Sequence, residues 1–145
     1  MGSKKSRRTD TQFAMIDKTL IESDAFKQLK GTAFKVYTFL RSKAYGDLMA
    51  ASGKRIPMAY STIVKVTGIS ISTVRDSIIK LENMGFIDLI EQGGLKSGGY
   101  SMNVYAISMR FKKFGTDEFE NGTMKKQTGV YDFGFGRQWK NKKQV

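Results

Sequence analysis

The twenty-residue run GISISTVRDSIIKLENMGFI, which begins at Gly68, constrains the fold more than any other stretch of the chain. Val74, Ile78 and Leu81 stand at positions i, i+4 and i+7, a spacing that places three side chains on one face of an α-helix. A glycine precedes this helix and Gly85 follows it, and glycine favours the left-handed conformation in which helices often end. The run therefore predicts a turn, a helix whose apolar face packs on a core, and a glycine stop.

The patterns on either side of this run predict further elements. In the N-terminal half we expect a strand or an irregular segment lying on the core at 13–21, a short helix at 24–29 capped by Ser23, and a helix capped by Thr32 and ended by Gly46. A loop at 47–54 and an extended piece at 55–58 follow. The C-terminal half is expected to contain helices at 61–67 and 71–84, strands at 86–91 and 100–107, and a short helix or turn at 108–114. The glycine-rich segment 92–99 joins the two longer strands as a hairpin loop.

A set of residues around the run matches a known arrangement. The set comprises Ser61 at the opening of a helix, Gly68 and Ile69 at the turn, Ser70, Ser72, Thr73 and Val74 at the start of the next helix, and Ile78, Leu81, Glu82, Gly85, Phe86 and Ile87 beyond it. With the glycine-rich loop that follows, residues 55–107, roughly a third of the chain, resemble bacterial winged-helix DNA-binding domains, including the MarR-like and replication-initiator-like kinds. The expected fold class is mainly α with a small β-hairpin, a winged helix-turn-helix.

The opening of the 71–84 helix supplies most of the candidate DNA contacts. Ser70 is a natural N-cap, and the free N–H groups of a helix N-terminus attract phosphate. In winged-helix proteins the recognition helix places its N-terminal residues at base edges in the major groove, and the wing lies along the backbone or minor groove. The candidate DNA-binding residues are Ser61, Ser70, Ser72, Thr73, Arg75, Asp76, Lys80, Lys96 and Ser97.

Alternatives stay open for individual residues of this set. Ser70 is explained by capping alone, and Arg75 either pairs with guanine or is an ordinary solvated charge. Asp76 can accept from cytosine N4, repel phosphate, or orient Arg75. Ile79 lies off the apolar stripe, so it meets a thymine methyl, another chain or the core of its own chain. Lys96 brings charge to a wing that either approaches phosphate or touches nothing.

The chain carries a formal net charge of +12, from 25 Lys and Arg against 13 Asp and Glu. Such an excess suits nucleic acid, an acidic protein or an anionic membrane surface. We divide the chain into a disordered basic arm at 1–12, a winged-helix domain at 13–115 and a disordered tail at 116–145. The basic arm and the tail are expected to bind phosphate without reading sequence. The tail holds the aromatic and basic stretch FGFGRQWKNKK, whose aromatic rings stack on bases, dock on a protein partner or have no role.

Several function classes are disfavoured by the residues that the chain lacks. There is no Cys and no His, which removes disulfides, thiolate metal sites and imidazole acid–base chemistry. We also find no paired carboxylates and no phosphate-binding loop, so we expect no catalytic, cofactor-binding or metal-binding residues. No apolar run approaches the roughly 20 residues of a membrane span, and no secretory signal begins the chain. The expected location is the prokaryotic cytoplasm or nucleoid, away from membranes.

The leading hypothesis is sequence-specific binding of double-stranded DNA without catalysis, as a transcriptional regulator or as a replication or segregation factor of a plasmid, phage or other mobile element. A homodimer is expected, with an interface at the N-terminal helices around Phe26 and at 34–39, although packing in the core competes for these side chains. The alternative hypothesis is a protein–protein interaction module that uses the winged-helix surface.

Overall fold

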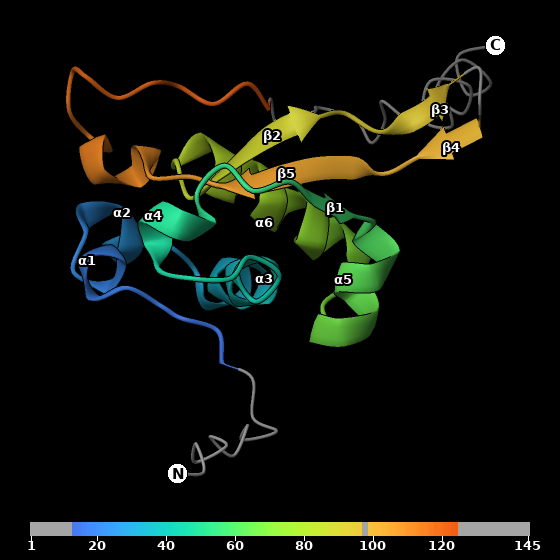
Figure 1. The fold of residues 1–145 in the computed structure, drawn as a ribbon, viewed down its shortest axis with the longest axis horizontal. Coiled ribbons are helices and arrows are strands. Elements are labelled where there is room, and N and C mark those ends of the chain that lie inside the picture. The colour runs from blue at the N-terminus through green and yellow to red at the C-terminus, as the bar shows by residue number, and fades with distance from the viewer. Residues whose placement is uncertain (1–12, 97–98, 125–145) are drawn as a thin grey trace, which may run out of the picture.

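The computed structural model describes residues 13–96 and 99–124, and most side chains within these ranges (Figure 1). The predicted arm at 1–12, the wing residue Ser97 and the tail from residue 125 onward, with its aromatic and basic stretch, lie outside the described residues.

The described ranges contain six α-helices, a short 3-10 helix and five strands. They are α1 (Lys18–Ile21), α2 (Asp24–Lys27), α3 (Gly31–Arg41), α4 (Leu48–Ala51), β1 (Ile56–Met58), α5 (Tyr60–Thr67), α6 (Ile71–Asn83), β2 (Ile87–Glu91), β3 (Gly94–Lys96), β4 (Gly99–Ser101), β5 (Asn103–Ile107) and η1 (Arg110–Lys113).

The strands form two connected antiparallel pieces. In the main sheet the order is β1-β5-β2, and Tyr105 of β5 stands opposite Ile56 on one side and Leu89 on the other. Strands β3 and β4 continue the β2–β5 hairpin as a separate two-stranded extension, with Leu95 opposite Tyr100. The fold is therefore mixed α/β, with more β structure than the small hairpin expected from the sequence, in an arrangement compatible with a winged-helix-like fold.

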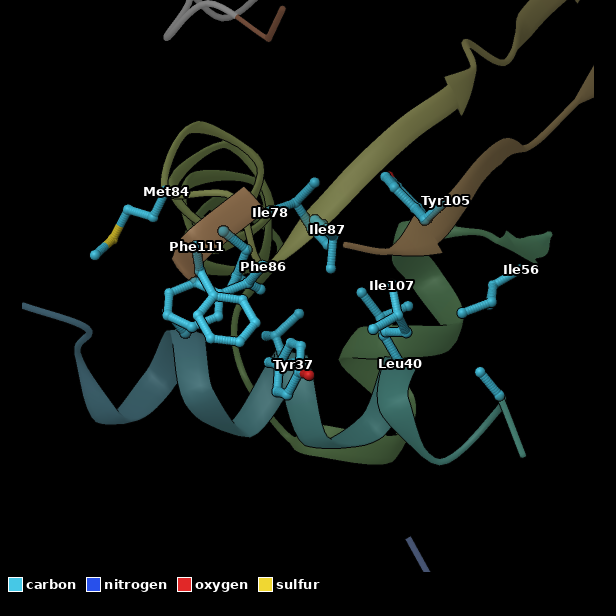
Figure 2. Packing of buried hydrophobic residues seen from close by; sticks show 14 of the residues in the cluster. Tyr37, Leu40, Ile56, Ile78, Met84, Phe86, Ile87, Tyr105, Ile107 and Phe111 are labelled. Atoms are coloured by element: carbon cyan, nitrogen blue, oxygen red, sulfur yellow. The ribbon is translucent and has the colours of Figure 1, made fainter. Parts of the chain in front are cut away.

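The core lies between the main sheet and helices α3, α5 and α6, while α1, α2 and α4 lie together to the left of α3 in the view of Figure 1. Figure 2 shows the centre of this core, where side chains of α3, α6 and the sheet converge. The Phe86 ring stacks on Phe111 at a centroid distance of 5.2 Å and meets Tyr37 edge-on at 5.8 Å. Burial raises the pKa of Tyr37 to about 12, so its hydroxyl stays protonated at physiological pH.

The predicted helix at 71–84 is confirmed as α6, which ends one residue earlier. Val74, Ile78 and Leu81 are fully buried, as their spacing predicted. Gly85 follows with φ +85°, and a Cβ there would collide with the backbone of Arg110, so both conformation and space require glycine. The sequence signals therefore place this helix correctly.

The N-terminal half of the domain differs from the prediction in two places. Residues 18–21 form the single helical turn α1, with Leu20 buried, where we expected a strand or an approach segment. Thr32 was expected to cap the next helix, but α3 begins one residue earlier, at Gly31, with Lys30 as its N-cap. The Ser23 cap of α2 is confirmed, since its hydroxyl oxygen accepts from the Phe26 N–H at 3.2 Å.

Two other segments expected to be loops contain regular structure. Residues 48–51 form α4 because Asp47 caps the turn, accepting from the Ala50 N–H at 2.9 Å, and Leu48 and Ala51 are buried. In the glycine-rich segment 92–99, residues 94–96 pair with β4 as strand β3. Both corrections concern elements of only three or four residues, too short to show a periodic pattern in the sequence.

The aromatic residues of the N-terminal helices pack within the chain. Phe26 meets Phe34 edge-to-face at a centroid distance of 5.3 Å, and both, with Phe39, lie half-buried against the core. Lys43 stands over the Phe39 ring, 5.3 Å from its centroid. Packing within the chain thus explains the positions of Phe26, Phe34 and Phe39, which the sequence analysis also considered for a dimer interface.

We predict that Ile78→Ala lowers the free energy of unfolding by about 2–5 kcal/mol, because it leaves a cavity in the core beneath α6. The matched control is Ile71→Ala in the same helix, where the side chain is 51% exposed and the change should stay within about 0.5 kcal/mol. Urea denaturation of the two variants measures both values. Equal losses would contradict the placement of the buried face.

Candidate nucleic-acid interface

The turn between α5 and α6 is built from local hydrogen bonds and one glycine. Gly68 adopts φ +72°, the left-handed conformation that glycine accepts without strain, and its N–H donates to Val64. Thr67 donates its hydroxyl to the Ile63 carbonyl at 2.6 Å and accepts from the Ile69 N–H. These contacts set where α6 starts relative to α5.

Ser70 caps α6, as the sequence predicted. Its hydroxyl oxygen accepts from the Thr73 N–H at 3.4 Å, and the hydroxyl donates to Thr73 Oγ1 at 2.9 Å. The Ser72 hydroxyl lies 3.4 Å from that of Ser70. A cluster of three hydroxyl groups therefore occupies the exposed N-terminus of α6, where the helix dipole is positive.

The predicted contact residues of α6 differ in how far they are exposed. Ser72 and Asp76 are exposed, whereas Thr73, Arg75 and Lys80 are half-buried. The reason is that the buried apolar side of α6 is wide and includes Ser77 and Glu82 as well as the apolar stripe. Exposed polar surface on α6 is thus narrower than the sequence pattern indicated.

A groove of about 500 Å³ runs between the start of α3 and one side of α6. Its lining residues are Lys30, Thr32, Ala33, Thr73, Asp76, Ser77, Ile79, Lys80 and Asn83. Three predicted contact residues therefore meet in this groove: Thr73, Asp76 and Lys80. Arg75 does not line it. Two lysines, Lys30 and Lys80, and one carboxylate, that of Asp76, line the groove. Lys30 was missed in the sequence because its position depends on how α3 packs against α6.

Ile79 is buried, with 8% of its surface exposed. It lines the groove and lies outside the main cluster of core residues. Among the three roles left open for it, this burial favours packing within its own chain over contact with a thymine methyl.

The first turn of α5 differs slightly from the prediction. The helix begins at Tyr60 with Ala59 as its N-cap, so Ser61 is the second helical residue and does not open the helix. Ala59 provides no side-chain hydrogen bond, and Ser61 is exposed. Because no side chain caps it, this end of α5 leaves N–H groups open to an anion.

The wing is joined to the core at its base. Asn103 Oδ1 accepts from the Gly93 N–H at 2.6 Å, and Asn103 Nδ2 donates to the Tyr105 hydroxyl oxygen at 2.9 Å. Tyr105 is fully buried, and this burial raises its pKa well above the ordinary range, so the phenol stays neutral. At Gly93 a Cβ would collide with the backbone of residues 101–103, so only glycine lets the two strands approach here. Lys96 is the last residue of β3, beside the wing tip.

Metal-binding clusters and membrane-spanning helices are both absent from the residues that the structure describes. Across 13–96 and 99–124, no group of three or more His, Cys, Asp or Glu side chains is placed to hold a metal ion. In the same part of the chain, no helix has the length and apolar character needed to cross a bilayer. Comparisons with protein-family models, curated proteins and solved structures found no significant match to this chain.

We predict that Ser70→Ala destabilises the protein by about 1 kcal/mol, because α6 loses the side chain that caps its N-terminus. Ser72→Ala removes a neighbouring hydroxyl that does not cap the helix and serves as the matched control, with a change expected within about 0.5 kcal/mol. Thermal or urea unfolding of both variants checks the difference. If Ser72→Ala cost as much as Ser70→Ala, the cap would not be the stabilising contact.

Proposed function

We propose that this chain is a non-catalytic winged helix-turn-helix protein that binds double-stranded DNA in a sequence-specific manner. In this proposal α6 enters the major groove, and the β3–β4 wing lies on the sugar-phosphate backbone. The observation that carries it is the unit formed by α5, the turn at Gly68 and α6, in which the apolar face of α6 is buried and its capped N-terminus is exposed. The strand order β1-β5-β2, with a hairpin extending beyond it, supports the same reading.

Base readout is assigned to the N-terminal half of α6. Ser72 and Asp76 are the exposed side chains there, and Thr73 and Arg75 flank them. Asp76 suits a cytosine N4 donor, and Arg75 suits the two acceptors of guanine. Ser72 and Thr73 are small, so the first turn of the helix can approach base edges closely.

Phosphate contacts are assigned to the surroundings of α6. Lys30 and Lys80 stand at the groove, Ser61 lies at the uncapped start of α5, and the wing contributes Lys96 and Ser97. Backbone N–H groups and cations in such positions orient a protein on the duplex without reading sequence. The net charge of +12 supports binding to a polyanion over binding to an acidic small molecule.

The biological role that suits this activity is transcriptional regulation, or replication or segregation of a plasmid, phage or similar element. Winged-helix proteins of these kinds commonly bind two half-sites as dimers, and we extend that expectation to this chain. A palindromic consensus, selected from a random duplex library, would support a homodimer. The second candidate is a protein–protein interaction module, which the groove between α3 and α6 favours because it is concave and of mixed polarity.

We predict that the protein binds duplex DNA at low salt and that the observed association constant falls steeply with ionic strength. The slope of log K against log salt is about −0.9 for each phosphate neutralised. Fluorescence anisotropy with a random-sequence duplex at several salt concentrations measures it. Failure to bind any duplex at low salt would remove this function and leave the protein-interaction module.

We predict that Arg75→Ala weakens binding to the selected site by about 1–3 kcal/mol and relaxes base choice at one position. Lys96→Ala is the comparison variant, because loss of a phosphate contact should weaken specific and nonspecific binding to the same extent. Competitive binding to the consensus and to a scrambled duplex separates the two effects. An unchanged base preference in Arg75→Ala would show that this side chain does not read a base.

A further inference from the structure

The start of α6 exposes an apolar side chain among its hydroxyl groups. Ile71 is the first residue of the helix, and 51% of its surface is exposed. Ile69, on the other side of the capping residue Ser70, packs half-buried against the core. Core packing therefore explains Ile69, whereas Ile71 keeps apolar surface in water that a bound molecule can cover.

Helix geometry places Ile71 on a definite side of α6. Successive residues are rotated by about 100°, so Ile71 and Arg75, four residues apart, lie about 40° apart around the helix axis. Ser72 and Asp76 form a second pair of the same kind, rotated by about 100° from the first. The start of α6 therefore presents two rows of side chains, and Ile71 occupies the N-terminal end of the row that contains Arg75.

The proposed docking geometry brings this end of α6 to the bases, because the N-terminal residues of a recognition helix reach base edges in the major groove. The Cα–Cβ bonds of a helix are tilted toward its N-terminus, so a side chain at position 71 extends toward that leading end. An isoleucine side chain has no hydrogen-bonding group. The thymine methyl is the apolar feature that base pairs present in the major groove, so it is the feature that Ile71 can recognise.

Two other apolar residues of the same unit do not meet these conditions. Ile79 is 8% exposed, so little of its surface is available to a base. Val66 is 58% exposed, but it belongs to α5, the helix that crosses the sugar-phosphate backbone in this docking geometry. Of these three residues, Ile71 alone combines exposure with a place on the helix that reads base edges.

The polar neighbours of Ile71 favour a single methyl group over a protein as its partner. Ser70 and Ser72 are both exposed, so the apolar surface at the helix start is one side chain wide. The centre of a protein–protein interface is a larger apolar patch, with a total buried area on the order of 1,600 Å². A thymine methyl flanked by the polar edges of neighbouring bases matches the arrangement at the start of α6.

We propose that Ile71 is a specificity-determining residue that contacts the 5-methyl group of a thymine in the recognised DNA sequence. This inference rests on the proposed function and names one base of its partner. Four residues of α-helix span about 6 Å, and base pairs are stacked about 3.4 Å apart. The thymine therefore lies within about two base pairs of the position that Arg75 reads.

The first test removes only the methyl group. Each thymine of the selected duplex is replaced in turn by deoxyuridine, which pairs in the same way and lacks the 5-methyl group. We expect replacement at one position, and at its symmetry equivalent in a palindrome, to weaken binding of the whole chain about fourfold, the value for about one CH₂-sized group removed from apolar contact. Fluorescence anisotropy at fixed salt measures the affinities. Equal affinity for every deoxyuridine duplex would overturn the inference.

The second test assigns the methyl contact to a residue by a double-mutant cycle between protein and DNA. In Ile71→Ala the penalty for deoxyuridine at the sensitive position should fall from about fourfold to less than about 1.5-fold, because the shorter side chain does not reach the methyl group. Val66→Ala is the matched control, because it trims a similarly exposed apolar side chain on α5 and should keep the full penalty. Thermal unfolding establishes that both variants are folded before their affinities are compared.

The outcomes distinguish this inference from the function on which it rests. If no duplex binds at low salt, the proposed function fails and the thymine contact fails with it. If the chain binds its selected site and a folded Ile71→Ala protein keeps the full deoxyuridine penalty, another side chain contacts the methyl group. The role of Ile71 is then overturned, its exposed surface is left for a protein partner, and DNA binding by α6 stands.

Discussion

Burial of Val74, Ile78 and Leu81 is the constraint from which the rest of the arrangement follows. Successive residues of an α-helix are separated by 100°, so fixing three side chains in the core fixes the rotation of α6 about its axis. That rotation decides which residues remain outside: Ser72 and Asp76 are exposed, and Thr73 and Lys80 are turned toward α3. It also carries Glu82 to the opposite flank, where the returning C-terminal segment meets it. One packing contact thereby orients the proposed readout surface, the groove and the Glu82 carboxylate that accepts from the Thr123 and Met124 N–H groups.

The sequence predicted the elements that depend on local signals and missed those that depend on distant partners. Helix α6, its Ser70 cap and the glycines at its ends follow from spacing and side-chain chemistry within a few residues. Helix α4 is too short for a periodic pattern, and its stability comes from Leu48 and Ala51 burying in a core made elsewhere. The bonds from Thr123 and Met124 to Glu82 join residues more than forty positions apart and leave no local trace. Gly122 is a local sign of this close approach, but a glycine in a polar segment is equally typical of an ordinary loop.

The candidate site likewise combines a feature that depends on neighbouring residues with one that depends on distant residues. Capping by Ser70 was predictable because the serine hydroxyl needs only the N–H three residues later. The groove was not predictable, because it requires the start of α3, with Lys30 and Thr32, to lie beside α6. Arg75 and Lys80 are half-buried because α6 buries a wider side than the apolar stripe at Val74, Ile78 and Leu81. Binary patterning predicts which face is buried but not how far the neighbouring elements extend around it.

The hydrogen bonds from Gly93 to Asn103 and from Asn103 to Tyr105 connect the wing to the core. Tyr105 belongs to the core cluster, whereas Gly93 stands at the base of the wing. The direction of the wing therefore depends on how the core packs around the Tyr105 ring. A core substitution that moves the Tyr105 ring is therefore expected to change the direction of the wing without altering any residue on the wing itself.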